Sequence, residues 1–166
     1  MNQAIFEKIN LKFLALYVIV LSFGSVILAL ISQYMFNMQP CAWCILQRMI
    51  FVLIGFITLG NMFINKKKLL ILFWGAVEAS ATLGMTAALY QFIVASKSFE
   101  CGISLAEKII NISYLNQILP SVFEVMGLCG ESSYILGIPY VIFSLLIFMF
   151  ISSISTVSLI KLFKSN

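Results

Sequence analysis

Residues 40–48 read Pro-Cys-Ala-Trp-Cys-Ile-Leu-Gln-Arg, and they lie where a short polar segment gives way to a long apolar run. The run begins at Ile45 and continues to residue 64, with Arg48 as its one charged side chain. That is about the 20 residues that a helix needs to cross the hydrocarbon of a bilayer. Because a backbone in lipid must satisfy its own hydrogen bonds, we predict that this run is a membrane-spanning helix.

The composition of the whole chain also indicates a membrane protein. Hydrophobic residues make up 62% of its 166 residues and charged residues only 10%, whereas soluble domains are roughly half apolar and about a quarter charged. We therefore predict an all-α integral membrane four-helix bundle, with residues 1–166 forming a single domain. The first span is expected to stay uncleaved, because its apolar run exceeds the roughly 7–15 residues of a signal-peptide core. The four predicted spans are residues 11–34, 45–64, 69–94 and 135–160.

The positions of the basic residues predict the orientation of the bundle. Seven of the ten Lys and Arg residues fall near the termini or in the turn between the second and third runs. Because cytoplasmic loops are enriched in Lys and Arg, we predict that both termini are cytoplasmic. The net charge of +4 is scattered over helix ends, so it does not indicate nucleic-acid binding. The seven residues are Lys8, Lys12, Lys66, Lys67, Lys68, Lys161 and Lys164.

Two segments, residues 35–44 and 95–134, then face the outer side. In the longer one, Ser104 followed by Glu107 matches a capping box and predicts the start of a short helix. Apolar residues at helical spacing follow, so we expect this helix to lie on the membrane surface and to end at Pro120. The segment after the proline carries a second apolar group, which consists of Val122, Phe123, Val125, Met126 and Leu128.

All four cysteines fall in these outer segments, Cys41 and Cys44 in the shorter and Cys101 and Cys129 in the longer. Cysteines that served only as small hydrophobic packing residues would be spread through the spans. On the outer side disulfides persist, so the Cys-x-x-Cys pair indicates a redox dithiol. A zinc site formed by all four cysteines is the alternative. We favour the redox function, because the cysteines face the oxidising side and the second pair is 28 positions apart, whereas zinc pairs are usually closely spaced.

Cys44 and Arg48 form the candidate centre of this chemistry. The partial positive charge of a helix N-terminus stabilises a thiolate, and Cys44 lies where the second span begins. Arg48 follows four residues later on the same helix face. An arginine just inside the membrane either anchors the helix by reaching outward or serves a function. We expect Arg48 to donate a hydrogen bond to a carbonyl oxygen of a lipid-soluble quinone, with Gln47 contributing to the same site.

The motif Pro-Cys-x-x-Cys-x-x-Gln-Arg at the start of the second of four spans, with two further outer cysteines, resembles the DsbB family of bacterial disulfide bond formation proteins. Residues 119–123 (Leu-Pro-Ser-Val-Phe) and 136–139 (Leu-Gly-Ile-Pro) also resemble the family pattern. The resemblance covers nearly the whole chain. It implies a bacterial inner-membrane oxidoreductase that reoxidises a periplasmic DsbA-like thioredoxin-fold protein and passes the electrons to ubiquinone or menaquinone.

The resemblance also implies a role for each cysteine. Cys101 would form the mixed disulfide with the partner protein, and Cys129 would then exchange with Cys41. Cys44 would lie nearer the quinone, which Arg48 would hold. Each exchange is the attack of a thiolate on a disulfide. Some family members carry a histidine near the outer end of the third span, and this chain has none.

Glu78 leaves a different function open. It lies nine residues into the predicted third span, and ionisable residues inside a membrane are candidate functional sites. A small transporter would use Glu78 as a coupling carboxylate and the cysteines as structural disulfides. We instead expect Glu78 to be a neutral, hydrogen-bonded packing residue. A third alternative, a redox protein of the vitamin K epoxide reductase type, shares the quinone chemistry but differs in chain organisation.

Overall fold

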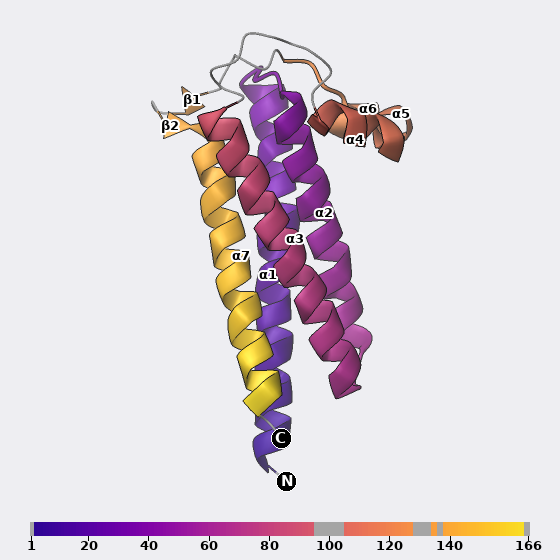
Figure 1. The fold of residues 1–166 in the computed structure, drawn as a ribbon, viewed down its shortest axis with the longest axis vertical. Coiled ribbons are helices and arrows are strands. Elements are labelled where there is room, and N and C mark those ends of the chain that lie inside the picture. The colour runs from indigo at the N-terminus through magenta and orange to yellow at the C-terminus, as the bar shows by residue number, and fades with distance from the viewer. Residues whose placement is uncertain (1, 95–104, 128–133, 136–137, 165–166) are drawn as a thin grey trace.

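Four long helices side by side dominate the computed structural model, which describes residues 2–94, 105–127, 134–135 and 138–164 (Figure 1). Each contains a segment that is long and apolar enough to cross a membrane. The predicted all-α, four-span bundle is therefore confirmed, and the chain is a multi-pass membrane protein. The four helices are α1 (Asn2–Met35), α2 (Ala42–Phe63), α3 (Lys67–Ile93) and α7 (Tyr140–Lys164).

The last span begins later than predicted, at Tyr140 rather than at residue 135. Two short strands, β1 (Tyr134–Ile135) and β2 (Ile138–Pro139), pair antiparallel immediately before it. A proline restricts the residue before it to extended conformations, so the chain cannot be helical up to Pro139. The prediction missed this boundary because the apolar run continues unbroken across the strand pair.

The described part of the longer outer segment contains three short helices. They are α4 (Leu105–Ser113), α5 (Leu115–Ile118) and α6 (Pro120–Phe123), and the predicted short helix is confirmed as α4. The prediction that Pro120 ends it was wrong, because α4 ends where Tyr114 adopts a left-handed backbone conformation with φ 55°. Pro120 instead begins α6, at a position where its missing N–H costs nothing. The proposed cap, Ser104, lies outside the described residues.

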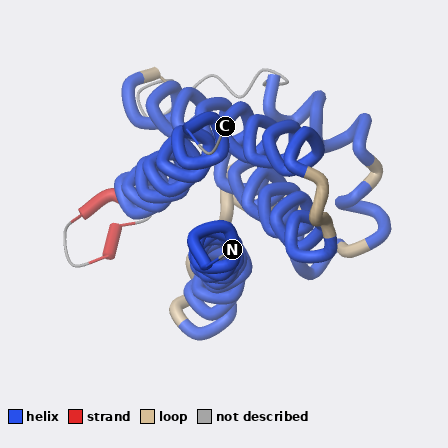
Figure 2. The backbone as a smooth tube through the Cα atoms, turned by 90° about the horizontal axis from the view of Figure 1, so that it is seen from below, coloured by secondary structure: helices blue, strands red, loops and turns tan. Residues whose placement is uncertain are grey.

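The two ends of the bundle differ in what they carry (Figure 1). Both termini and the α2–α3 turn lie at one end, and α4, α5 and α6 lie beside the start of α2 at the other. Figure 2 shows the bundle from the end with the termini, where α1 and α7 carry the N- and C-terminal residues. The predicted cytoplasmic basic residues and the predicted outer cysteine pair therefore belong to opposite ends.

Gly84 allows α3 and α7 to pack closely. Ala76, Ser80 and Gly84 are spaced by four, a pattern that predicts a close helix contact. A Cβ on Gly84 would collide with the ring of Phe148 in α7. That ring is fully buried and stacks on Phe51 of α2 with ring centroids 4.0 Å apart, so it has no room to move. The predicted small-residue contact is confirmed at this position.

Gly84→Ala is expected to lower the free energy of unfolding by about 1–3 kcal/mol, the usual cost of overpacking. This loss should appear although alanine favours a helix over glycine by about 1 kcal/mol. Gly75→Ala on the same helix is the matched control, because apart from its chain neighbours and the local helix backbone no described atom lies within 4 Å of the added methyl group. Unfolding titrations in detergent compare the two variants, and equal stability of both would show that the Phe148 contact is not tight.

Candidate functional site

The cysteine pair forms the first turn of α2. Cys41 is the N-cap of the helix in an extended conformation, and Cys44 lies inside the first turn. Their sulfur atoms are 3.2 Å apart and both thiols are free, so the pair is in the dithiol form. Cys41 Sγ is the hydrogen-bond donor and Cys44 Sγ the acceptor. The two sulfurs can close into a disulfide with a small shift.

Apolar side chains from three other helices enclose this turn. Cys41 is buried, and the ring of Trp43 packs against Tyr90 of α3 with centroids 4.8 Å apart. The same buried cluster includes side chains of α4 and α6, which cover the turn on the side of the longer outer segment. These residues are Ala106, Ile110 and Phe123.

This environment favours the protonated form of Cys41. Its thiol donates a hydrogen bond to Cys44, and burial removes the water that would stabilise a charged sulfur. Both effects raise the pKa of Cys41 above its ordinary value, the hydrogen bond more than the burial. Cys41 therefore keeps its proton while the sulfur of Cys44 receives a hydrogen bond.

Arg48 lies inside the protein with only 6% of its surface exposed. One guanidinium nitrogen donates to Gln33 Oε1 at 2.7 Å and to the carbonyl of Val122 at 3.1 Å. The second terminal nitrogen of the guanidinium donates to the carbonyl of Ala29 at 3.3 Å. The arginine thus ties α2 to α1 and α6 instead of reaching outward to solvent. These three acceptors are neutral oxygens, which leaves the positive charge available to an anion beside it.

Gln47 contacts the third span. Its Nε2 donates to Oε1 of Gln91 at 2.7 Å. Nε2 of Gln91 in turn donates to both sulfurs, at 3.3 Å to Cys41 and 3.2 Å to Cys44. The structure therefore links Gln47 to the dithiol through a second amide that the sequence analysis did not single out.

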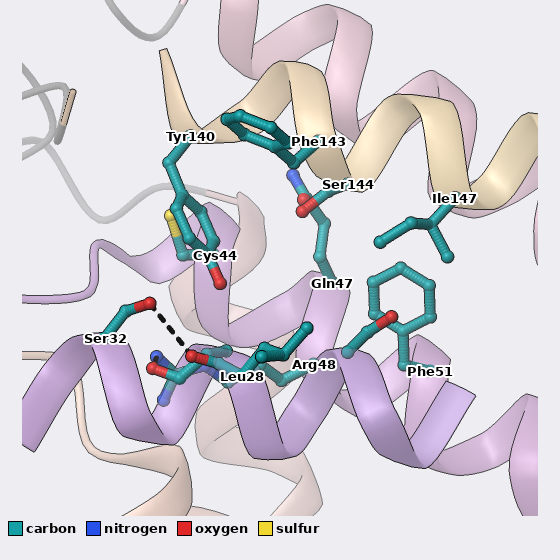
Figure 3. Close-up of a pocket in the computed structure, with 12 residues that line it drawn as sticks. Leu28, Ser32, Cys44, Gln47, Arg48, Phe51, Tyr140, Phe143, Ser144 and Ile147 are labelled. Carbon is teal, nitrogen blue, oxygen red and sulfur yellow. Dashed lines mark hydrogen bonds between the residues drawn. The ribbon is translucent and has the colours of Figure 1, made fainter. Parts of the chain in front are cut away.

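A cavity of about 250 Å³ lies between α1, α2 and α7, and its walls are mostly apolar (Figure 3). In Figure 3, Cys44, Gln47 and Arg48 enter it from α2, while Tyr140 and Phe143 face them from α7. The lining residues Leu28 and Phe143 are 60% and 39% exposed, so the cavity is accessible from the side of the bundle. The full lining consists of Ser25, Leu28, Ala29, Ser32, Cys44, Gln47, Arg48, Phe51, Tyr140, Phe143, Ser144 and Ile147.

The longer outer segment docks directly beside Cys41. The backbone N–H groups of Met126 and Gly127 donate to the carbonyl of Pro40, at 3.1 and 3.0 Å. A Cβ on Gly127 would lie 2.7 Å from the backbone carbonyl oxygen of Gln39, so only glycine fits this approach. Two residues before Cys129, the chain is thus fastened to the residue before Cys41.

The predicted residues Cys101, Cys129 and Glu78 are not part of the site that the structure describes. Cys101 and Cys129 lie outside the described residues, so their predicted roles, and the zinc alternative that needs all four cysteines, stay predictions. Oε1 of Glu78 accepts a 2.6 Å hydrogen bond from Ser152 of α7, and Glu78 is not among the residues that line the cavity. This contact supports the expected packing role of Glu78.

Sequence reasoning missed Gln33 and Gln91. Both are amides near the outer end of an apolar run, and polar residues in membrane helices often bond across helices. That signal was available, but it does not say which partner each amide contacts. Only the packing of α1 and α3 against α2 brings them to Arg48 and to the sulfurs.

Comparisons with known proteins point to one family. The family model described as "Disulfide bond formation protein DsbB" matches residues 11–158. A disulfide bond formation protein B of Cupriavidus metallidurans is 32% identical over 149 residues, which cover 88% of this chain and 91% of that protein. The corresponding protein of Ralstonia nicotianae is 30% identical over 92% of this chain and 96% of its own length. No solved structure matches the chain significantly.

Proposed function

Because the chain belongs to the DsbB family of disulfide bond formation proteins, we propose that it is a quinone-dependent protein-disulfide oxidoreductase. It reoxidises a periplasmic DsbA-like thioredoxin-fold protein and passes the electrons through two cysteine pairs to ubiquinone or menaquinone. The first pair, Cys101 and Cys129, oxidises the partner. The second pair, Cys41 and Cys44, delivers the electrons to the quinone.

One observation carries this proposal: the two sulfurs of the dithiol, 3.2 Å apart, face different surroundings. Cys44 and Arg48 line the lateral cavity. Cys41 instead lies beside Pro40, where the longer outer segment docks. A dithiol placed in this way can receive electrons from the outer loop through one sulfur and release them toward the membrane through the other.

The cavity suits a quinone ring for three reasons. Its walls are mostly apolar, it is accessible from the side where lipid surrounds the bundle, and a guanidinium lines it beside a sulfur. A bound quinone supplies an acceptor for two electrons and two protons. Arg48 would hold the quinone through an N–H donor, since its three hydrogen bonds to described residues use three of its five N–H groups. Gln47 would border the same ring.

The cysteines and the partner carry out four thiol–disulfide exchanges in order. A partner thiolate attacks the Cys101–Cys129 disulfide at Cys101, and the partner's second thiol resolves the mixed disulfide. The freed Cys129 thiolate then attacks Cys41 of a Cys41–Cys44 disulfide, which releases Cys44 as a thiolate beside Arg48. Cys101 then attacks the sulfur of Cys129 in the Cys41–Cys129 disulfide, which re-forms the outer disulfide and releases Cys41 as the leaving thiolate. The inner pair is then left as a dithiol, which loses two electrons and two protons to close again.

The docking of Gly127 supports the attack of Cys129 on Cys41. Two residues of extended chain span at most about 7 Å, and Cys129 follows Gly127 by two residues. The two backbone hydrogen bonds to Pro40 therefore hold the start of the Cys129 segment within reach of Cys41.

Gly127→Ala is expected to lower the yield of a trapped Cys41–Cys129 disulfide about fivefold or more. The added methyl group cannot fit against the carbonyl of Gln39. An overpacking cost of about 1–3 kcal/mol lowers the population of the docked segment about fivefold or more. The measurement is mass-spectrometric mapping of disulfides after acid trapping during turnover. Gly24→Ala is the control, because apart from its chain neighbours and the local helix backbone the new methyl group meets no described atom within 4 Å. An unchanged yield in Gly127→Ala would contradict the docking role.

The proposal includes an orientation in the bacterial inner membrane. The basic residues of the α2–α3 turn and of the two terminal helices belong to the end that carries both termini. The positive-inside rule then gives this end to the cytoplasm and the cysteine pair to the periplasm. This orientation supports the proposal, because disulfides persist on the periplasmic side.

A further inference from the structure

Among the residues that the structure describes, Gln91 of α3 contacts both reacting sulfurs from outside their own helix. Its Nε2 lies 3.3 Å from Cys41 Sγ and 3.2 Å from Cys44 Sγ. An amide nitrogen carries two hydrogens, so a single group can donate one hydrogen bond to each sulfur. Gln91 takes no part in the roles that the family resemblance implies for the four cysteines.

Gln47 determines which way the amide of Gln91 faces. Nε2 of Gln47 donates to Oε1 of Gln91 at 2.7 Å. If the Gln91 amide were turned over, its NH₂ group would face the NH₂ group of Gln47, and its oxygen would face the lone pairs of the sulfurs. The contact with Gln47 therefore directs the donors of Gln91 toward the dithiol.

The donors favour one oxidation state of the pair. In the dithiol state, Cys44 Sγ accepts hydrogen bonds from both the Cys41 thiol and the Gln91 amide. These hydrogen bonds become strong when Cys44 is released as a thiolate, because one partner is then ionised. A disulfide sulfur is neutral and a weak acceptor, so the same donors gain little when Cys41 and Cys44 are joined.

We infer that Gln91 stabilises the reduced state of the Cys41–Cys44 pair, and that Gln47 is a positioning residue that orients it. Together they raise the reduction potential of the pair, so that the pair accepts electrons from the outer cysteines more readily. The inference rests on the proposed function only in taking Cys41 and Cys44 as a redox pair. It gives Gln47 a role in addition to its place in the cavity wall.

The test is a redox titration of the full-length protein with Cys101→Ser and Cys129→Ser, so that one pair remains. The protein, in detergent and free of quinone, is equilibrated with glutathione buffers, in which two glutathione thiols reduce the protein disulfide and become one glutathione disulfide. After acid quenching, alkylation reports the fraction of dithiol. Gln91→Met, which keeps the side-chain length and removes both donors, should lower the equilibrium constant for reduction about tenfold, or about 30 mV for this two-electron couple.

Three further variants make the result specific. Gln91→Leu should give the same shift, and it serves as the second variant if the methionine variant does not fold. Gln47→Leu should give a smaller shift in the same direction. Gln117→Leu makes the same chemical change at an exposed position of α5 and should give none. An unchanged or raised equilibrium constant in both Gln91 variants, or an equal shift in Gln117→Leu, would overturn the inference.

The outcome is separate from that of the proposed function, because the titration contains no quinone. A shifted constant together with absent quinone reduction would contradict the proposed function alone. Normal quinone reduction together with an unshifted constant would contradict the role of Gln91 alone.

Discussion

Cys44→Ser is expected to lower quinone-dependent oxidation of a reduced DsbA-like substrate by about 10³-fold or more, the scale of loss when a reacting nucleophile is removed. A serine hydroxyl cannot form a disulfide with Cys41, so no electrons can leave the pair toward the cavity. The change removes one sulfur and adds one oxygen, and the first turn of α2 should remain intact. Turnover is measured as the absorbance change of the quinone on reduction.

The control for this variant is Ser153→Ala. Ser153 lies at an exposed position of α7, and its hydroxyl donates to the backbone carbonyl of Met149 in the same helix. The Ser153→Ala variant should leave the turnover rate and the free energy of unfolding unchanged. If Cys44→Ser turned over at the rate of this control, Cys44 would not be the donor to the quinone, whatever the other cysteines do.

Arg48→Met is expected to weaken quinone binding and the bundle together. The methionine leaves the acceptors Gln33 Oε1 and the carbonyls of Val122 and Ala29 without their donor. A hydrogen bond from a charged group contributes about 1.5–3 kcal/mol, and about 1.4 kcal/mol is tenfold in affinity. We therefore expect the KM for quinone to rise about 10- to 100-fold, with a smaller change in kcat.

Gln33→Leu separates the two effects of Arg48. It removes one acceptor of the guanidinium while the positive charge stays at the cavity wall. It should lower the free energy of unfolding by about 1–3 kcal/mol, because Arg48 loses a buried partner, and it should change the KM little. If Gln33→Leu raised the KM as much as Arg48→Met, the arginine would act through packing and not as a quinone ligand.

The sequence predicted the architecture well because its strongest signals are local. Apolar runs of about 20 residues indicate spans wherever they occur, and the cysteine pair lies where the second run begins. The predicted start of α7 and the predicted role of Pro120 were wrong because backbone conformation, and not hydropathy, sets both boundaries. The residues before Tyr140 pair as strands inside an unbroken apolar run, and α4 ends at the left-handed Tyr114, well before the proline.

The site could be predicted only in part, because its decisive contacts join different helices. The four-residue spacing predicted that Cys44 and Arg48 lie on one helix face, and both line the same cavity. It could not tell whether Arg48 faces water or protein, since both fit an arginine at a membrane boundary. Nor could it pair Gln91 with the sulfurs, because that contact depends on the register of α3 against α2.

The central claim is that the electrons of the substrate thiols leave through Cys44 to a quinone in the lateral cavity. The most direct test uses the purified protein, stripped of quinone and reconstituted in lipid under anaerobic conditions with the reduced DsbA-like substrate. Added ubiquinone or menaquinone should start oxidation, with one substrate disulfide formed for each quinone reduced. Oxidation at the same rate without quinone, or disulfide formation with no quinone reduced, would contradict the account.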